Sequence, residues 1–158
     1  RSSAASDVYK RQIDGWAVGG GLALATACDF RICSTGSRFG APIAKTLSNT
    51  LSSRNIARLV ASLGVPRVKR MLLLADYLSA GQAEACGFVH AVVPADQLQA
   101  EAQALAEQLM ALSATTQSAV KESLRRIVVE QRLDDEDLVS AVYGSGEFRA
   151  GVAGFNRQ

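Results

Sequence analysis

The sequence predicts an α/β core followed by a wholly helical C-terminal region. Within residues 13–32, a short apolar run, three consecutive glycines, a small-residue segment and a second apolar run indicate strand, turn, helix and strand. Beyond Pro94, apolar residues recur at steps of three and four, which is the period of amphipathic helices. We therefore expect an α/β core over 13–93 and a helical region over 94–158.

The first twelve residues are left out of this core. Residues 1–12 are polar, follow neither a helical nor a strand period, and contain no methionine. The string resembles translated adaptor sequence. We therefore expect a non-native tail, followed by a core whose N-terminal part is missing.

Composition narrows the class of protein. Of the 158 residues, 48% are hydrophobic and 20% are charged, which is typical of soluble globular proteins. Three cysteines without metal-ligand spacing and a single histidine predict no metal site. No signal peptide opens the chain, and the apolar runs stay below the roughly 18 residues that span a bilayer. We expect a cytoplasmic protein with no membrane partner.

Local signals place the next elements of the core. Residues 43–53 have no clean period and are expected to form a loop. Ser53 is expected to cap a helix over 54–63 that Gly64 ends. Pro66 suits the first turn of a further helix, because that turn needs no N–H at its start.

The rest of the chain is placed in the same way. Ser79 should cap a short helix that ends before Gly87, and residues 88–93 have the alternation and β-branching of a strand. In the C-terminal region, Thr115 or Thr116 is expected to cap a second helix. The acidic run 134–137 suits the first turn of a third helix, where the helix dipole favours negative charge.

The glycine turn at residues 19–21 is the main candidate for a functional site. Glycines at the start of a helix let a ligand approach the backbone, and the unpaired N–H groups there favour an anion. Leu22 and Ala23 exclude a phosphate-binding P-loop, and Leu24 replaces the third glycine of a dinucleotide fingerprint. A turn that only lets the helix pack on the strand remains the alternative.

The same stretch resembles the crotonase superfamily, the enoyl-CoA hydratase/isomerase group. Members carry an apolar strand, Asn or Asp with Gly, three glycines, an Ala/Leu-rich helix and Cys-Asp-x-Arg. In this chain the matching residues are Asp14, Gly15, Gly19, Gly20, Gly21, Cys28, Asp29 and Arg31, with further matches at Ala80, Ala83, Gly87, Phe88 and Val89 and at 143–151. The resemblance implies a crotonase-like ββα spiral core without its N-terminal part. It also implies a helical region that packs on neighbouring subunits, as a homotrimer or hexamer.

The resemblance further implies a substrate and a mechanism. Family members bind an acyl-CoA thioester and stabilise its enolate with two backbone N–H groups, one of which points here to Gly20. Coenzyme A is then part of the substrate, and no covalently bound cofactor is expected. Asp14, Asp29 and Arg31 are expected to be structural. The residues expected around the substrate are Trp16, Gly19, Gly20, Gly21, Ala23, Phe39, Pro42 and Ile43.

The proton-transfer groups of family hydratases do not match. Ala23 and Ile43 stand where those hydratases carry two glutamates, and neither side chain can act as an acid or base. Water addition by paired carboxylates is therefore not expected. Polar residues of the following segment are weaker candidates, because turn formation and helix capping account for them: Lys45, Thr46, Ser48, Asn49, Ser52 and Arg54.

Basic residues are concentrated in one stretch. Residues 30–75 contain eight Lys or Arg and no Asp, Glu or His. Such a stretch suits the phosphates of coenzyme A, or it pairs with acidic residues of the fold or of a second subunit. Nucleic acid is not expected as a partner, because aromatic residues that stack bases are almost absent there.

Three hypotheses follow from the sequence. The first is an acyl-CoA enzyme whose acid/base group lies elsewhere or whose reaction needs only enolate stabilisation. The second is a catalytically silent crotonase-like subunit that binds CoA esters or serves in assembly. The third is an unrelated α/β ligand-binding domain with a glycine turn.

Overall fold

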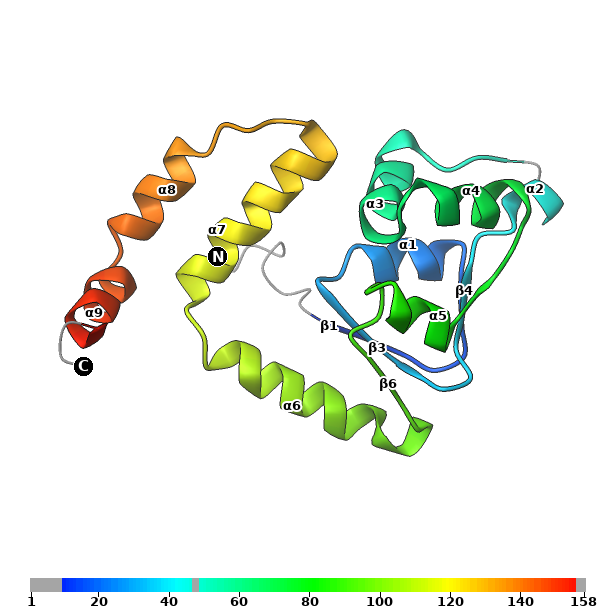
Figure 1. The fold of residues 1–158 in the computed structure, drawn as a ribbon, viewed down its shortest axis with the longest axis horizontal. Coiled ribbons are helices and arrows are strands. Elements are labelled where there is room, and N and C mark those ends of the chain that lie inside the picture. The colour runs from blue at the N-terminus through cyan, green and yellow to red at the C-terminus, as the bar shows by residue number, and fades with distance from the viewer. Residues whose placement is uncertain (1–9, 47–48, 156–158) are drawn as a thin grey trace. The chain divides into compact units, whose positions relative to one another are not determined.

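The structure is a computed structural model, and it describes residues 10–46 and 49–155 (Figure 1). The chain divides into two compact units, residues 1–106 and 107–158. The first unit combines sheets and helices, and the second is helical. The α/β fold expected from the sequence, with a helical C-terminal region, is confirmed. The boundary between the units lies within a helix that begins after Pro94.

Two small sheets form the framework of the first unit. One sheet is parallel throughout, in the order β1-β3-β6, and the other has the order β2-β4-β5 with β5 antiparallel. The strands are β1 Lys10–Ile13, β2 Trp16–Val18, β3 Phe30–Ser34, β4 Arg38–Gly40, β5 Leu78–Ser79 and β6 Ala91–Val93. Each sheet thus joins segments that are distant in the sequence.

The first strand differs from the expected one in two ways. It begins at Lys10, so three residues of the expected tail 1–12 pair with β3, and the first nine residues lie outside the described part. The Gln12 side chain also donates to the carbonyl of Leu98 at 3.2 Å. The apolar run is broken after Ile13, because Gly15 has φ +93° and turns the chain into the second sheet.

Among the described residues, five helices precede β6 in the first unit. They are α1 Gly20–Thr26, α2 Ile43–Thr46, α3 Ser53–Leu63, α4 Val65–Leu73 and α5 Ala80–Ala85. Gly64 ends α3 with φ +76°, and Pro66 lies in the first turn of α4, as expected. Ser79 caps α5 in a capping box with Gln82, which confirms that prediction.

Three local expectations for residues 43–93 were wrong. Residues 43–46 form the short helix α2 rather than a loop. The cap of α3 is Ser52, whose hydroxyl accepts from the Asn55 N–H at 3.3 Å, so the helix begins one residue earlier than expected. The strand expected over 88–93 is reduced to β6. Phe88 and Val89 are instead buried in the core, where Phe88 packs edge to face on Phe39.

The helical region begins inside the first unit. Its elements are η1 Ala95–Gln97, α6 Leu98–Met110, α7 Ala114–Arg125, the π-turn η2 Arg126–Glu130, α8 Glu136–Tyr143 and α9 Gly146–Phe155. The cap of α7 is Ser113, whose hydroxyl accepts from the Thr116 N–H, so Thr115 and Thr116 are not the cap. The acidic run contributes Glu136 and Asp137 to the first turn of α8, which confirms part of that expectation.

Ion pairs connect α7 and α8 in the second unit. Arg126 contacts Glu122 at 3.0 Å and Asp137 at 2.7 Å. Its hydrogen bonds hold the pKa of Asp137 down at about 2, and hydrogen bonds from Arg125 and Arg126 lower that of Glu122 to about 2 as well. Within residues 10–46 and 49–155, every helix falls short of the length and apolarity that crossing a membrane requires.

Arg31 is the buried polar centre of the first unit. Its side chain is only 9% exposed and donates to the carbonyl oxygens of Ala25 at 3.1 Å and Cys28 at 2.6 Å, and also to that of Phe88. The guanidinium carbon lies 4.6 Å from the centre of the Phe88 ring. One side chain on β3 thus ties the end of α1 to the segment before β6, in agreement with the structural role expected for it.

We predict that Arg31→Met lowers the free energy of unfolding by about 2 to 4 kcal/mol, because it removes the hydrogen bonds to the carbonyl groups of Cys28 and Phe88, whereas that of Ala25 keeps the Cys28 N–H as a donor. Urea unfolding followed by circular dichroism measures the change. Arg67→Met is the matched control, because Arg67 is exposed and donates only to the carbonyl of Leu63 among the described residues. Its effect should stay within about 0.5 kcal/mol. Equal losses in the two variants would contradict the structural role of Arg31.

Candidate functional site

The glycine turn connects β2 to α1 and has a defined backbone geometry. Gly19 has φ +53°, a left-handed conformation that a residue with a side chain rarely adopts. Its N–H donates to the carbonyl of Gly40 at 3.1 Å, and its carbonyl accepts from the Ala23 N–H at 3.0 Å. The turn is therefore fixed on one side by β4 and on the other by the first turn of the helix.

Gly20 and Gly21 form the start of α1, and their backbone conformation does not require glycine as that of Gly19 does. A Cβ atom at either position would meet nothing within 4 Å, and neither residue has a left-handed φ. Packing within the described residues therefore does not require glycine at these two positions. The Gly20 N–H is one of the helix-start donors without an intrahelical acceptor, and no described residue accepts from it. Both glycines leave the start of the helix open to an external group.

A groove of about 250 Å³, counting space open to solvent, lies beside this turn between α1 and α3. Gly19, Ala23 and Thr26 line it from the α1 side, while Asn55 and Arg58 line it from α3. Leu22, Leu51 and Leu59 complete the apolar wall. Most of this volume is open to solvent, and the enclosed part is about 10 Å³, which is room for about one water molecule.

The structure brings together only some of the residues expected around a substrate. Gly19 and Ala23 line the groove, whereas Gly20 and Gly21 are the first two residues of α1 and are not among its lining residues. The Ala23 side chain is a methyl group, which can neither take up nor release a proton.

The other four expected residues lie outside the groove. Trp16 is 63% exposed and packs edge to face on Tyr77 at 4.9 Å between ring centres, whereas Phe39 is fully buried in the core. Pro42 and Ile43 are half-buried where α2 begins. Their part in an acyl pocket stays a prediction.

Asn55 and Arg58 were not singled out from the sequence. Their spacing places them on one face of a helix, which is a signal that the sequence does contain. That this face lies against the glycine turn depends on the packing of α3 on α1. Three of the polar residues that the sequence offered as weaker candidates can be placed or set aside. Ser52 caps α3, and the Thr46 hydroxyl donates to the carbonyl of Pro42 at 2.9 Å. Ser48 lies outside the described residues.

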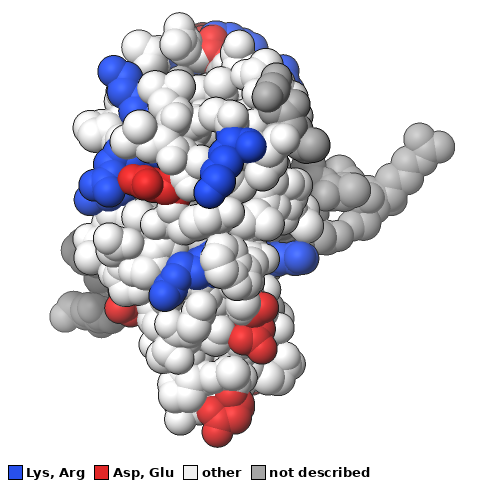
Figure 2. Space-filling view, turned by 90° about the vertical axis from the view of Figure 1, so that its right-hand side faces the viewer, with Lys and Arg blue, Asp and Glu red and all other residues white. Residues whose placement is uncertain are grey.

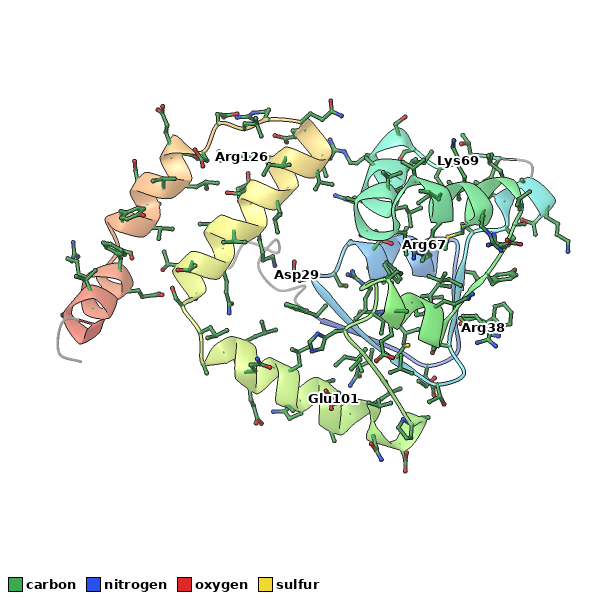
Figure 3. All side chains as sticks on the ribbon, viewed as in Figure 1. Asp29, Arg38, Arg67, Lys69, Glu101 and Arg126 are labelled. Atoms are coloured by element: carbon green, nitrogen blue, oxygen red, sulfur yellow. The ribbon has the colours of Figure 1, made fainter. Side chains whose placement is uncertain are left out.

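The basic stretch 30–75 is spread over the surface of the first unit. Lys and Arg side chains lie at several separate places on the face in Figure 2, most of which consists of uncharged residues, and its lowest part carries acidic side chains. Arg67 and Lys69 extend from α4, and Arg38 from β4 (Figure 3). Arg70 forms an ion pair with Asp76 at 2.9 Å, and Arg31 is buried. These two arginines therefore interact with other parts of the chain.

Other reactive groups are poorly placed for catalysis. Burial raises the pKa of the Cys33 thiol to about 11, which keeps it protonated and weakly nucleophilic near neutral pH. Among the described residues, no group of three or more His, Cys, Asp or Glu side chains could hold a metal ion. The chemically distinctive feature of the first unit is thus the open start of α1 beside the groove.

Comparison with known proteins identifies the family of this chain. The family model for enoyl-CoA hydratase/isomerase matches residues 11–157. The chain is 31% identical over 147 residues to the Mycobacterium bovis protein named "Probable enoyl-CoA hydratase echA8", a match that covers 90% of this chain and 57% of the relative. The chain therefore spans little more than half the length of that relative.

Solved structures give the same result. An enoyl-CoA hydratase/carnithine racemase from Magnetospirillum magneticum matches with a TM-score of 0.77 and 26% identity, over 92% of this chain and 56% of that one. A Thermobifida fusca protein described as an enoyl-CoA hydratase, solved in complex with acetoacetyl-CoA, matches with a TM-score of 0.71 and 27% identity, over 98% and 57%. This chain belongs to the enoyl-CoA hydratase/isomerase family of the crotonase superfamily.

We predict opposite effects on stability at two positions of the glycine turn. Gly19→Ala should lower the free energy of unfolding by about 1 kcal/mol or more, because φ +53° is strained for alanine. Gly21→Ala should raise it by about 0.4 to 1 kcal/mol, because the added methyl group meets nothing and alanine favours the helix. Urea unfolding measures both. A loss of stability in both variants would show that Gly21 is required by packing within the chain.

Proposed function

We propose that the complete protein carrying this chain binds acyl-CoA thioesters and stabilises a thioester enolate, as an enzyme of the enoyl-CoA hydratase/isomerase type. The observation that carries this proposal is the Gly20 N–H, which no described residue accepts from, at a helix start that two glycines leave open. Family membership and the acetoacetyl-CoA bound to the Thermobifida fusca relative support the choice of ligand.

The proposed role of Gly20 is electrostatic. When a proton leaves the carbon beside a thioester carbonyl, negative charge develops on the carbonyl oxygen. A backbone N–H held in place by the rest of the turn stabilises that charge without reorganising, and one such donor is worth about 3 kcal/mol. Gly19 holds this donor, because its own N–H and carbonyl are bonded to Gly40 and Ala23. The resemblance assigns the second donor to a segment outside this chain.

The reaction at this site differs from hydration by paired carboxylates. Ala23 and Ile43 occupy the places of the two glutamates, and no acidic residue lines the groove. We propose that the proton-transfer group, which an isomerisation also needs, comes from outside the described residues, or that the reaction is a decarboxylation or C–C cleavage, in which a C–C bond rather than a C–H bond breaks to give the enolate. Coenzyme A takes part as a portion of the substrate, without a covalently bound cofactor.

A catalytically silent subunit is the second candidate. Ala23 and Ile43 favour it, because the chain then keeps the thioester-binding turn without the proton-transfer groups. Such a protein binds CoA esters and turns none of them over.

We also propose assembly as a homotrimer or hexamer in the cytoplasm. Exposed apolar side chains on the helices of the second unit, such as Leu124, Ile127 and Tyr143, are compatible with subunit contacts.

We predict that Gly20→Pro weakens binding of acetoacetyl-CoA and slows any turnover by about a hundredfold or more, because proline removes the N–H that contacts the oxyanion. Gly20 is the first residue of α1, where proline is tolerated, so folding should survive. Calorimetry and rate measurements on the complete protein test this.

Gly20→Ala is the matched variant, because it adds a carbon atom and keeps the N–H. The difference between the two variants measures the hydrogen bond itself. Equal losses in both, or binding that survives the proline, would remove Gly20 from the oxyanion hole. Binding without turnover of any acyl-CoA in the wild-type protein would favour the silent subunit.

A further inference from the structure

Four large apolar side chains of the first unit remain exposed and are linked through Tyr77. Leu73 and Leu74, at the end of α4, are each 69% exposed, Trp16 on β2 is 63% exposed, and Tyr77 is 42% exposed. The rings of Trp16 and Tyr77 pack edge to face with their centres 4.9 Å apart. Two residues separate Leu74 from Tyr77. We call these four side chains the apolar patch.

The segment between α4 and β5 holds the two parts of the apolar patch together. Ala75 has φ +57°, and the N–H of Asp76 donates to the carbonyl of Arg70 at 3.2 Å, so the chain turns back on the end of α4. The Tyr77 ring is packed against the second sheet, since a Cβ at Gly40 would lie 2.5 Å from it. The apolar patch is therefore built on a helix and a sheet rather than on a loose segment.

Positively charged side chains accompany the apolar patch. Lys69 extends from α4, and Arg38 extends from β4, where it is the strand partner of Trp16 (Figure 3). From β3 to β5 the sequence contains a single acidic residue, Asp76. Its carboxylate already forms an ion pair with Arg70 at 2.9 Å. The charge around the patch is thus positive and suits an anionic partner.

This combination of side chains is the one that binds the surface of an anionic bilayer. Exposed leucines enter the boundary of the acyl region, and tryptophan and tyrosine rings lie at the level of the headgroups. Lysine and arginine are attracted to anionic headgroups within a Debye length of the surface. A protein partner fits less well, because the centres of protein interfaces are depleted in lysine.

We propose that the apolar patch docks the protein on the surface of an anionic lipid bilayer. Leu73 and Leu74 enter the acyl boundary, while Lys69 and Arg38 lie against lipid phosphates. This partner differs from the sequence-based expectation of no membrane partner, which considered spanning segments and signal peptides alone. The proposal does not rest on acyl-CoA binding.

Sedimentation of the complete protein with lipid vesicles tests the proposal in the absence of any acyl-CoA. One set of vesicles is pure phosphatidylcholine, and the other contains equal parts of phosphatidylcholine and phosphatidylglycerol. At low ionic strength, binding to the mixed vesicles should be at least about tenfold stronger, because each Lys or Arg near an anionic surface contributes about fivefold. Molar salt should remove most of this difference, because it shortens the Debye length to about 3 Å.

Two sets of variants assign the binding to the apolar patch. Leu73→Ser combined with Leu74→Ser should weaken binding to mixed vesicles about tenfold, because apolar area no longer enters the bilayer. Leu133→Ser is the matched control, because Leu133 is 81% exposed in the second unit, and it should change binding by less than about twofold. Lys69→Gln should cost about fivefold, and Arg149→Gln, at an exposed position of α9, should cost less than about twofold.

Trp16 reports on the docked state directly. It is the one tryptophan of these 158 residues, and its ring is exposed in the absence of lipid. On mixed vesicles its emission should shift to shorter wavelength as the ring leaves water, and Trp16→Phe identifies its share of the emission of the complete protein. Emission from Trp16 that stays unchanged in the bound protein would contradict the proposal.

The remaining outcomes are equally decisive. Failure to bind either kind of vesicle, equal binding to both kinds, or binding that survives Leu73→Ser with Leu74→Ser would overturn the proposal. A second copy of the chain is the other possible occupant of the patch. If the wild-type protein ignores vesicles and the leucine variants change its mass in light scattering, the patch is a subunit contact, and the membrane proposal is refuted. Circular dichroism shows whether each variant is folded.

Discussion

The hydrogen bond from the Gly19 N–H to the Gly40 carbonyl is the contact on which the candidate site depends. It joins the end of β2 to the end of β4, which pair in parallel from Trp16 to Val18 and from Arg38 to Gly40. With this N–H engaged and φ held at +53°, the chain enters α1 with the Gly20 N–H at its open end. A backbone donor needs such support, because it cannot be oriented by a rotamer of its own.

Two further contacts support the position of α1 and of the glycine turn. Arg31 joins the end of α1 to the segment before β6 through its hydrogen bonds to backbone carbonyls. The packing of Tyr77 on Gly40 fixes the other end of the turn, since a Cβ at Gly40 would lie 2.5 Å from the tyrosine ring. The chain before α1 is therefore held by Gly40, which packs against Tyr77, and the end of α1 is held by Arg31, while Gly20 and Gly21 stay open to a ligand.

The sequence predicted those features that local chemistry determines. Gly64, Pro66 and Ser79 mark helix ends correctly, because caps and first-turn proline act within a few residues. The break after Ile13 was missed, because β2 leaves the first sheet only by pairing with β4, more than twenty residues later. The short helix α2 was missed because four residues give no measurable period.

The candidate site also has a part that could be predicted from the local sequence and a part that depends on contacts between distant segments. The glycine turn is continuous in sequence and was recognised from its motif, together with the missing carboxylates at Ala23 and Ile43. Asn55 and Arg58 come to the turn through the packing of α3 on α1, which a single sequence does not reveal. Phe39 shows the same limit, because its motif position does not indicate that its ring is fully buried against Phe88.

The most direct test of the central claim is a crystal structure of the complete protein with an unreactive acyl-CoA analogue. We expect the thioester oxygen to lie about 2.7 to 3.1 Å from the Gly20 nitrogen, the distance of an oxyanion-hole hydrogen bond. An analogue bound with its thioester oxygen away from Gly20, or a turn whose Gly20 N–H is bonded to another part of the protein, would contradict the account.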